Sequence, residues 1–208
     1  MDENVIAAMA RWPGVPAVFG WLSLNERGQW RLHPAGDALA DADAPDPYAR
    51  QGTSITSPQI LQFMGRNYEC DETGRWFFQN GPQKVYVRLD AAPFVLHTGN
   101  PTDGRPSLHT HTGLQVTRVA SWWLTEAGRL YALTDPGPGL VAGRDLDSVL
   151  DALRATDGTK VLDVLEAGGG APPGLTVLGP ATDACPLHFC KEADIPSRLG
   201  FVRLPRAD

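Results

Sequence analysis

The sequence predicts an α+β fold in which antiparallel β-hairpins and short helices form two similar lobes. Alternating apolar and polar residues, as in residues 84–90, indicate strands with one buried face. Turn segments rich in Asn, Asp and Gly separate such runs, and short stretches with helical spacing lie between them. We expect a hairpin-helix-hairpin lobe over residues 1–98, and a hairpin-helix lobe with an irregular tail over residues 99–208.

The first lobe is expected to hold two helices and two hairpins. A helix over residues 3–12 ends at Pro13-Gly14, and residues 17–32 form the first hairpin. Ser57 and Pro58 are typical of a helix start, and a hairpin follows this second helix.

Residues 34–52 predict an exposed loop, because they are rich in Ala, Asp, Pro and Gly without periodicity. The four aspartates of this stretch suggest calcium, but they lack the closing Glu of a calcium loop, so a solvated linker is favoured.

The second lobe is expected to begin with a turn-rich loop over residues 99–107. Residues 114–133 predict a hairpin, and a helix follows with Asp145 as its N-cap. Residues 160–166 fit either a helix or a strand. The tail over residues 175–204 shows no clear hydrophobic periodicity and is expected to be irregular, except for a short edge strand over residues 201–204.

One turn pattern recurs three times, in residues 24–30, 70–76 and 124–130. Each copy places Asn, Asp or Thr before a Gly, and an aromatic residue or Leu then starts the returning strand. Convergence of hairpin turns explains the pattern as well as a true repeat does. The recurring helices favour a repeated hairpin-and-helix unit.

Composition narrows the class of protein. The formal net charge of −6 and the scattered Lys and Arg residues argue against nucleic-acid binding. No apolar run reaches the ~20 residues that cross a bilayer, and the N-terminus is acidic where a secretory signal is basic. Together with only 3 Cys residues, this predicts a cytoplasmic protein without a membrane contact.

The central part of the chain resembles a bacterial family of unknown function. The matching residues are Gly28, Trp30, Leu61, Phe63, Asp71, Gly74, Pro82, Lys84, Val85, Val87, Asp90, Ala92, Pro93 and Phe94. The chain departs from the family at Gln83, where the family has an acid, and at the extra Ala91. The resemblance covers residues 18–97 and shows no match beyond residue 135. It implies two lobes of repeated hairpins and helices and a place in signal transduction, and it brings no catalytic residues.

Two clusters contain residues that bind metals. His109 and His111 are spaced to project from one face of a strand, and Cys185, His188 and Cys190 lie within six residues. Pooled, they would supply enough ligands for zinc. Cys185 and Cys190 could instead form a disulfide or carry a thiolate activated by His188, and solvent-facing histidines and buried thiols explain the same residues.

A third cluster lies where the second helix meets its hairpin. It combines polar and aromatic side chains that could hold a small anionic ligand or a peptide: Arg66, Asn67, Tyr68, Trp76, Asn80, Gln83 and Lys84. Structural roles for the same residues are the alternative.

No catalytic constellation can be assembled from the spacing of the residues, and the sequence indicates no particular cofactor. The first hypothesis is therefore a cytoplasmic module that binds a small ligand or a protein partner, with the place in signal transduction that the resemblance implies. The second is a metal-dependent enzyme or metal sensor that uses the His109/His111 and Cys185/His188/Cys190 clusters.

Overall fold

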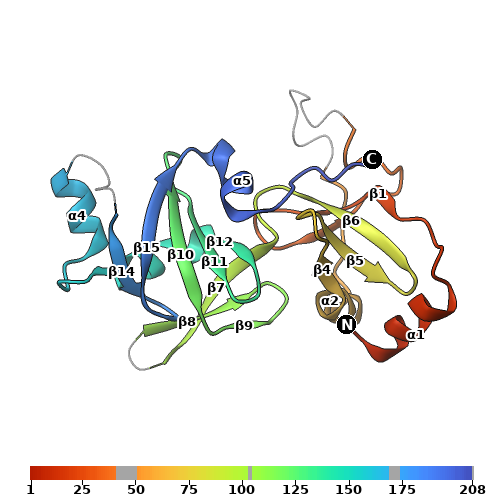
Figure 1. Cartoon of the computed structure of the whole chain (residues 1–208), viewed down its shortest axis with the longest axis horizontal. Coiled ribbons are helices and arrows are strands. Elements are labelled where there is room, and N and C mark those ends of the chain that lie inside the picture. The colour runs from red at the N-terminus through yellow and green to blue at the C-terminus, as the bar shows by residue number, and fades with distance from the viewer. Residues whose placement is uncertain (41–50, 103–104, 169–173, 208) are drawn as a thin grey trace. The chain divides into compact units, whose positions relative to one another are not determined.

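The computed structural model describes residues 1–40, 51–102, 105–168 and 174–207. The chain forms two compact units (Figure 1). Unit 1 comprises Met1–Pro93 and Gly200–Asp208, and unit 2 comprises Phe94–Leu199. The boundary expected after residue 98 would fall inside a strand of unit 2, and separate folding of the two segments stays a prediction.

Unit 1 is built on a six-stranded sheet with the order β3-β2-β1-β6-β5-β4. Its strands are β1 (Val18–Leu24), β2 (Trp30–Leu32), β3 (Thr53–Ser54), β4 (Tyr68–Cys70), β5 (Trp76–Asn80) and β6 (Gln83–Leu89). Its helices are α1 (Glu3–Arg11) and α2 (Pro58–Arg66). Helix α2 buries Met64, and the Trp30 and Tyr68 rings meet edge to face with centroids 5.0 Å apart. These aromatic residues form the core of unit 1.

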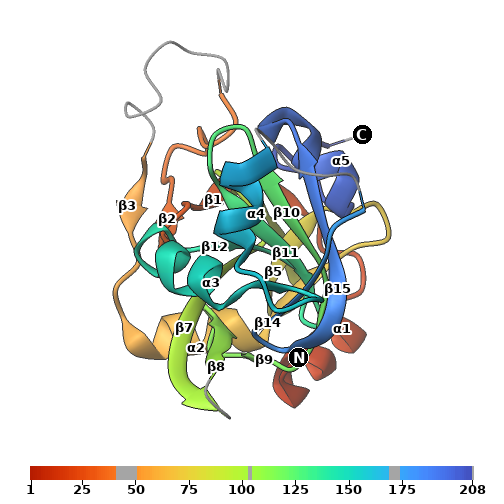
Figure 2. The same cartoon turned by 90° about the vertical axis from the view of Figure 1, so that its left-hand side faces the viewer.

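Unit 2 is built on a nine-stranded sheet with the order β13-β14-β15-β10-β11-β12-β7-β8-β9. Its strands are β7 (Phe94–Thr102), β8 (Arg105–Thr110), β9 (Gln115–Val116), β10 (Val119–Thr125), β11 (Leu130–Thr134), β12 (Pro138–Val141), β13 (Arg154–Ala155), β14 (Thr176–Gly179) and β15 (Thr182–Cys190). Its helical segments are η1 (Gly143–Asp145), α3 (Leu146–Ala152), α4 (Val161–Gly168), η2 (Glu192–Asp194) and α5 (Ile195–Leu199). Helix α4 faces the viewer in Figure 2.

The two sheets share one strand order. β3-β2-β1-β6-β5-β4 in unit 1 corresponds to β12-β11-β10-β15-β14-β13 in unit 2, and β7, β8 and β9 extend the second sheet beyond β12. The pair β1–β6 and its counterpart β10–β15 are both parallel: Leu22 lies opposite Val87, and Trp122 lies opposite Leu187. The chain is an α+β protein whose two sheets match the expected two lobes, although parallel pairs accompany the expected antiparallel hairpins.

Four turns share one hydrogen-bonding pattern: three of them join consecutive strands, and the fourth follows β13 and leads into α4. The amide of Asn25 donates to the Gln29 carbonyl and the amide of Gly28 donates to the Asn25 carbonyl; the same bonds recur in the turns that start at Asp71, Thr125 and Ala155. The turns at Asn25 and Thr125 therefore occupy equivalent places, whereas the counterpart of the turn at Asp71 starts at Ala155. The sequence pattern had missed this last copy.

Two expectations about unit 2 were wrong. The loop predicted over residues 99–107 contains the end of β7 and the start of β8, and the tail predicted as irregular contains β14 and the nine-residue β15. Residues 201–204 form no strand, and residues 160–166 are mostly helical, within α4.

Most of the predicted aspartate-rich linker, residues 41–50, lies outside the described residues. Within the part of the chain that the structure describes, no helix is long and apolar enough to cross a membrane.

Candidate functional site

A groove of about 1090 Å³ lies in unit 2. It is lined by β8, the edge strand β9, the segment leading into β10, and the turn between β14 and β15 with the start of β15. Ligand pockets commonly have volumes of ~300–1,000 Å³. The groove is therefore large enough for a small molecule.

The groove combines an apolar floor with a polar rim. Leu108, Val116 and Cys185 are buried among its lining residues, whereas Arg118 and Asp183 are exposed. A hydrogen bond from the Val119 amide to the Ala181 carbonyl, 2.9 Å long, fixes the start of β10 against the turn between β14 and β15. One wall of the groove is thus held by backbone rather than by mobile side chains.

A second group of polar residues surrounds His97 of β7. His109 of β8 lies directly opposite His97, and the centroids of the two rings are 5.7 Å apart. His97 Nδ1 lies 3.0 Å from Asp145 Oδ2, and Thr98 Oγ1 donates to Asp145 Oδ1 at 2.8 Å. Arg144 reaches the same two groups, with Nη2 3.3 Å from His97 Nδ1 and Nε 3.4 Å from Asp145 Oδ2.

Burial disfavours the charged forms of Asp145 and His109, whereas hydrogen bonds favour the charged form of Asp145. Partial burial alone would raise the pKa of Asp145, but hydrogen bonds from Thr98, His97 and Arg144 outweigh it and lower that pKa. Partial burial, with a smaller contribution from His97, lowers the pKa of His109. At neutral pH the group therefore contains an ionised Asp145 and a neutral His109 imidazole.

The other residues of the predicted metal clusters lie in different surroundings. His111 is half-buried and packs against Phe94, and burial of its imidazole lowers the pKa of His111 to about 3. The His188 ring stacks on Trp123 with centroids 4.2 Å apart. His109 and His111 therefore have different neighbours, although they are only two residues apart.

The two thiols of β15 are not brought together. No disulfide joins Cys185 to Cys190, and their five-residue separation along a strand places them on opposite faces, about 16 Å apart. A disulfide between them is incompatible with this strand. Among the residues that the structure describes, no group of three or more His, Cys, Asp or Glu residues is placed to hold a metal ion.

The predicted ligand cluster of unit 1 is engaged largely in internal contacts. Arg66 Nε donates to Asp2 Oδ1 at 2.9 Å, and Asn67 Oδ1 accepts the Asp2 amide at 2.8 Å. These contacts hold the start of the chain against the end of α2.

The remaining members of that cluster lie along β4, β5 and β6. The Tyr68 hydroxyl donates to the Pro93 carbonyl, and the Tyr68 and Trp76 rings pack with centroids 4.9 Å apart. Gln83 Nε2 donates to the Pro16 carbonyl, Lys84 Nζ lies over the Phe77 ring, and Asn80 is exposed. A binding role for the seven residues stays a prediction.

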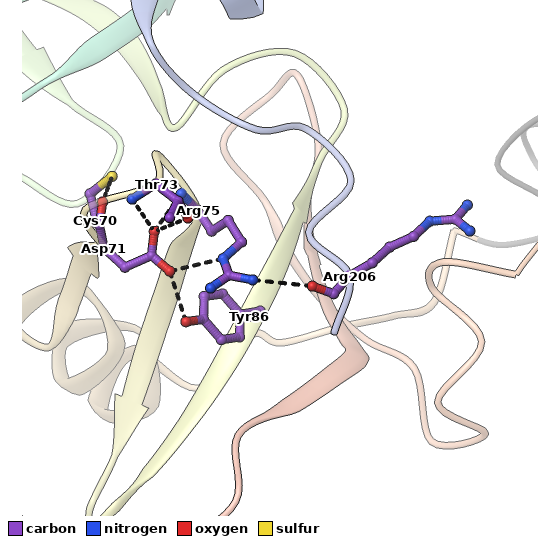
Figure 3. Close-up of polar contacts among 6 residues, drawn as sticks. All are labelled: Cys70, Asp71, Thr73, Arg75, Tyr86 and Arg206. Carbon is purple, nitrogen blue, oxygen red and sulfur yellow. Dashed lines mark hydrogen bonds and ion pairs between the residues drawn. The ribbon is translucent and has the colours of Figure 1, made fainter. Parts of the chain in front are cut away.

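Asp71 organises the most highly connected polar turn of unit 1 (Figure 3). Its Oδ1 accepts hydrogen bonds from both the amide and the hydroxyl of Thr73 and from the Arg75 amide, and its Oδ2 accepts from Arg75 Nε and the Tyr86 hydroxyl. Arg75 Nη1 continues to the Arg206 carbonyl at 3.3 Å. These bonds tie the C-terminal segment to the turn between β4 and β5.

The sequence did not predict a site role for His97, and it indicated Asp145 only as a helix cap and not as a partner of His97. It also did not predict most of the groove. Asp103-Gly104 is a dipeptide typical of two-residue hairpin turns. Had this dipeptide been taken as a hairpin turn, residue 97 would have been expected to pair with a residue close to 109. The groove has no comparable signal, because its walls come from two distant segments, residues 106–120 and residues 179–185.

These features define an α+β protein with two mixed sheets of related topology and a groove in the second. The chain belongs to the family DUF2944, described as "Protein of unknown function (DUF2946)", whose model matches residues 1–206. The family relationship thus extends past residue 135, where the sequence alone showed no match. No curated protein matches the chain.

Two solved structures are similar to this chain. One is a DUF1285 family protein from Silicibacter pomeroyi DSS-3, with 17% identity and a TM-score of 0.43 over 82% of this chain and 80% of that one. The other is a DUF1285 family protein from Shewanella baltica OS155, with 16% identity and a TM-score of 0.42 over 61% of this chain and 87% of that one.

Proposed function

We propose that this protein is a cytoplasmic binding module whose unit 2 holds a small amphipathic molecule in the groove between β8, β9, β10 and the turn between β14 and β15. The groove itself, with its volume of about 1090 Å³, is the observation that carries the proposal. A place in signal transduction is part of the proposal and rests on the family resemblance alone.

The lining residues indicate the chemistry of the ligand. Leu108, Val116 and Cys185 provide a buried apolar floor that favours an apolar body. Arg118 and Asp183 place one charge of each sign among the exposed lining residues. A ligand with an apolar body and an ionised group, such as a carboxylate facing Arg118, would satisfy both parts of the groove.

Binding of the dye 8-anilinonaphthalene-1-sulfonate, which has an apolar body and one anionic group, tests the proposal. Ala184 is exposed and lines the groove, so Ala184→Trp fills the groove with little effect on the core. Ala127 is exposed in the turn between β10 and β11 and is not a lining residue, so Ala127→Trp is the matched control.

We expect the wild-type protein and Ala127→Trp to bind the dye with one saturable site, and Ala184→Trp to lose at least tenfold in affinity. Circular dichroism serves to check that both variants are folded. Equal dye affinity in the wild type and Ala184→Trp would contradict the proposal.

A further inference from the structure

A pair of histidines in unit 2 has the geometry of a metal chelate. His97 and His109 are direct partners across the antiparallel strands β7 and β8, so their side chains project from the same face of the sheet. Their ring centroids lie 5.7 Å apart with an interplanar angle of 41°. Two imidazoles bound to one tetrahedral ion at ~2.0–2.1 Å have ring centroids about 5 Å apart. A small side-chain adjustment therefore brings both rings onto one ion.

Asp145 orients one of the two rings. Its Oδ2 lies 3.0 Å from His97 Nδ1, and its Oδ1 is held by the Thr98 hydroxyl at 2.8 Å. An ionised carboxylate favours the tautomer with a proton on Nδ1, which leaves the lone pair of Nε2 free to bind a metal. The same carboxylate–histidine arrangement supports the ligands of known metal sites. The side chains of His97 and Asp145 are only 14% and 13% exposed, so the ring has little freedom to reorient.

Gly99 leaves space beside the pair. It lies two residues after His97, on the same face of β7. A Cβ at this position would approach Ser107 Oγ to 2.7 Å and His109 Nδ1 to 3.5 Å. The absence of a side chain at residue 99 therefore opens a small polar space, bordered by a hydroxyl and an imidazole, in which water could complete the coordination of an ion.

We propose that His97 and His109 bind one divalent transition-metal ion that favours imidazole, such as Zn²⁺ or Ni²⁺, with water in the remaining coordination positions and Asp145 as the positioning residue for His97. Such a two-histidine site is consistent with the lack of any larger ligand group among the described residues. It is an open, exchangeable site rather than a structural one. Oxygen-preferring Mg²⁺ is not expected to bind there.

Arg144 acts against the ion. Its Nη2 lies 3.3 Å from His97 Nδ1 and its Nε lies 3.4 Å from Asp145 Oδ2. A hydrogen bond donated by Arg144 to Nδ1 requires the tautomer with the proton on Nε2, which cannot bind a metal, and the guanidinium adds a positive charge beside the site. Its side chain is 75% exposed and can move into solvent when the ion binds. Removing this charge should therefore tighten metal binding, whereas a metal site elsewhere on the chain would not respond.

Isothermal titration calorimetry with Zn²⁺ and Ni²⁺ tests the site on the full chain, purified without a histidine tag, stripped with EDTA and carrying Cys70→Ser to remove the exposed thiol. We expect one site per chain. Binding should be lost in His97→Ala and in His109→Ala, and retained in the control His188→Ala, whose ring stacks on Trp123.

Two further variants separate a positioned chelate from a general loss of structure. Asp145→Asn keeps the shape of the side chain and should weaken binding by about 10- to 100-fold. Arg144→Ala should bind more tightly than the parent protein. Full binding by His97→Ala, or no binding by a folded parent protein at millimolar metal, would overturn the proposal. Dye binding in the groove is a separate measurement, so the two proposals can fail independently.

Discussion

Replacement of Asp71 by alanine should cost more stability than the matching substitution of Asn25 in the first turn of unit 1. The carboxylate accepts bonds from the Thr73 amide at 2.9 Å, from the Thr73 hydroxyl at 2.7 Å and from the Arg75 amide at 3.0 Å. It also accepts from Arg75 Nε at 2.9 Å and from the Tyr86 hydroxyl at 2.8 Å. The side chains of Arg75 and Asp71 are only 18% and 13% exposed, so water replaces these bonds poorly.

The magnitude follows from comparing this turn with a simpler one. Asn25 Oδ1 accepts from the Arg27 and Gln29 amides at 3.0 and 2.9 Å, which is the same local pattern without the buried partners. Loss of these exposed bonds in Asn25→Ala should cost about 1 kcal/mol. Asp71→Ala also removes the bonds from Arg75 and Tyr86 to a charged group, so its total cost should be about 3 kcal/mol.

Urea unfolding followed by circular dichroism measures both variants. With a slope of ~1–3 kcal/mol per molar urea, Asp71→Ala should lower the midpoint by roughly 1–3 M, and Asn25→Ala by a third of that shift. Amide hydrogen exchange in β5 and β6 should locate the loss in unit 1. Equal midpoints for the two variants would refute the assignment of the extra stability to Arg75 and Tyr86.

Three further changes have defined outcomes. Partial burial alone would raise the pKa of Asp71, but its hydrogen bonds outweigh burial and lower that pKa well below the usual range. The stabilising effect of the ionised Asp71 should therefore be complete above about pH 4 and should fall as the pH drops further. Urea unfolding at several pH values should show that Asp71→Ala loses less stability in acid than the wild type does. Ala181 has a φ of 52°, and Gly81 has a φ of 58° at the equivalent turn; Ala181→Gly should stabilise the protein and Gly81→Ala should destabilise it, each by about 1 kcal/mol in urea unfolding. A Cβ on Gly139 would lie 2.7 Å from Leu96 Cγ, so Gly139→Ala should overpack the core, cost about 1–3 kcal/mol and lower the melting temperature; an unchanged melting temperature would argue against that packing.

Local signals predicted much of unit 1. The helical spacing before Arg66, the start at Ser57-Pro58 and the alternation over residues 84–90 led to α2 and β6. The parallel pairing of β1 with β6 was not predictable in the same way, because no short-range pattern specifies which distant strand a strand will join.

Prolines and glycines concealed the strands of unit 2. Pro186 lies inside β15 although this strand is paired on both sides, and Gly99, Pro101 and Pro106 interrupt the apolar alternation of β7 and β8. Proline donates no backbone hydrogen bond and normally argues against a central strand. The tail was expected to be irregular because of such local preferences. In the structure, tertiary packing outweighs them.

The candidate sites depended on these same missed strands. His109 was recognised as a metal-binding residue, but the expected partner, His111, is two residues away along the chain, whereas the structure places His97 directly opposite His109. Cys185 was recognised for its thiol, yet its role as a lining residue of the groove follows only from the approach of β15 and the start of β10 to β8 and β9. Sites formed by non-local strand pairing need the register, which composition and spacing do not provide.

The most direct test of the proposed binding groove places a reporter thiol at residue 184, because Ala184 is exposed and lines the groove. A Cys70→Ser/Cys190→Ser protein carrying Ala184→Cys would be equilibrated with a panel of small disulfide-capped fragments, and its adducts would be measured by intact mass spectrometry. Ala127→Cys in the same background is the matched control, because Ala127 is exposed and does not line the groove. We predict selective capture of fragments with an apolar body and an ionised group at residue 184, and no such selectivity at residue 127. Capture that ignores fragment structure, or that is the same at both positions, would contradict a ligand site in this groove.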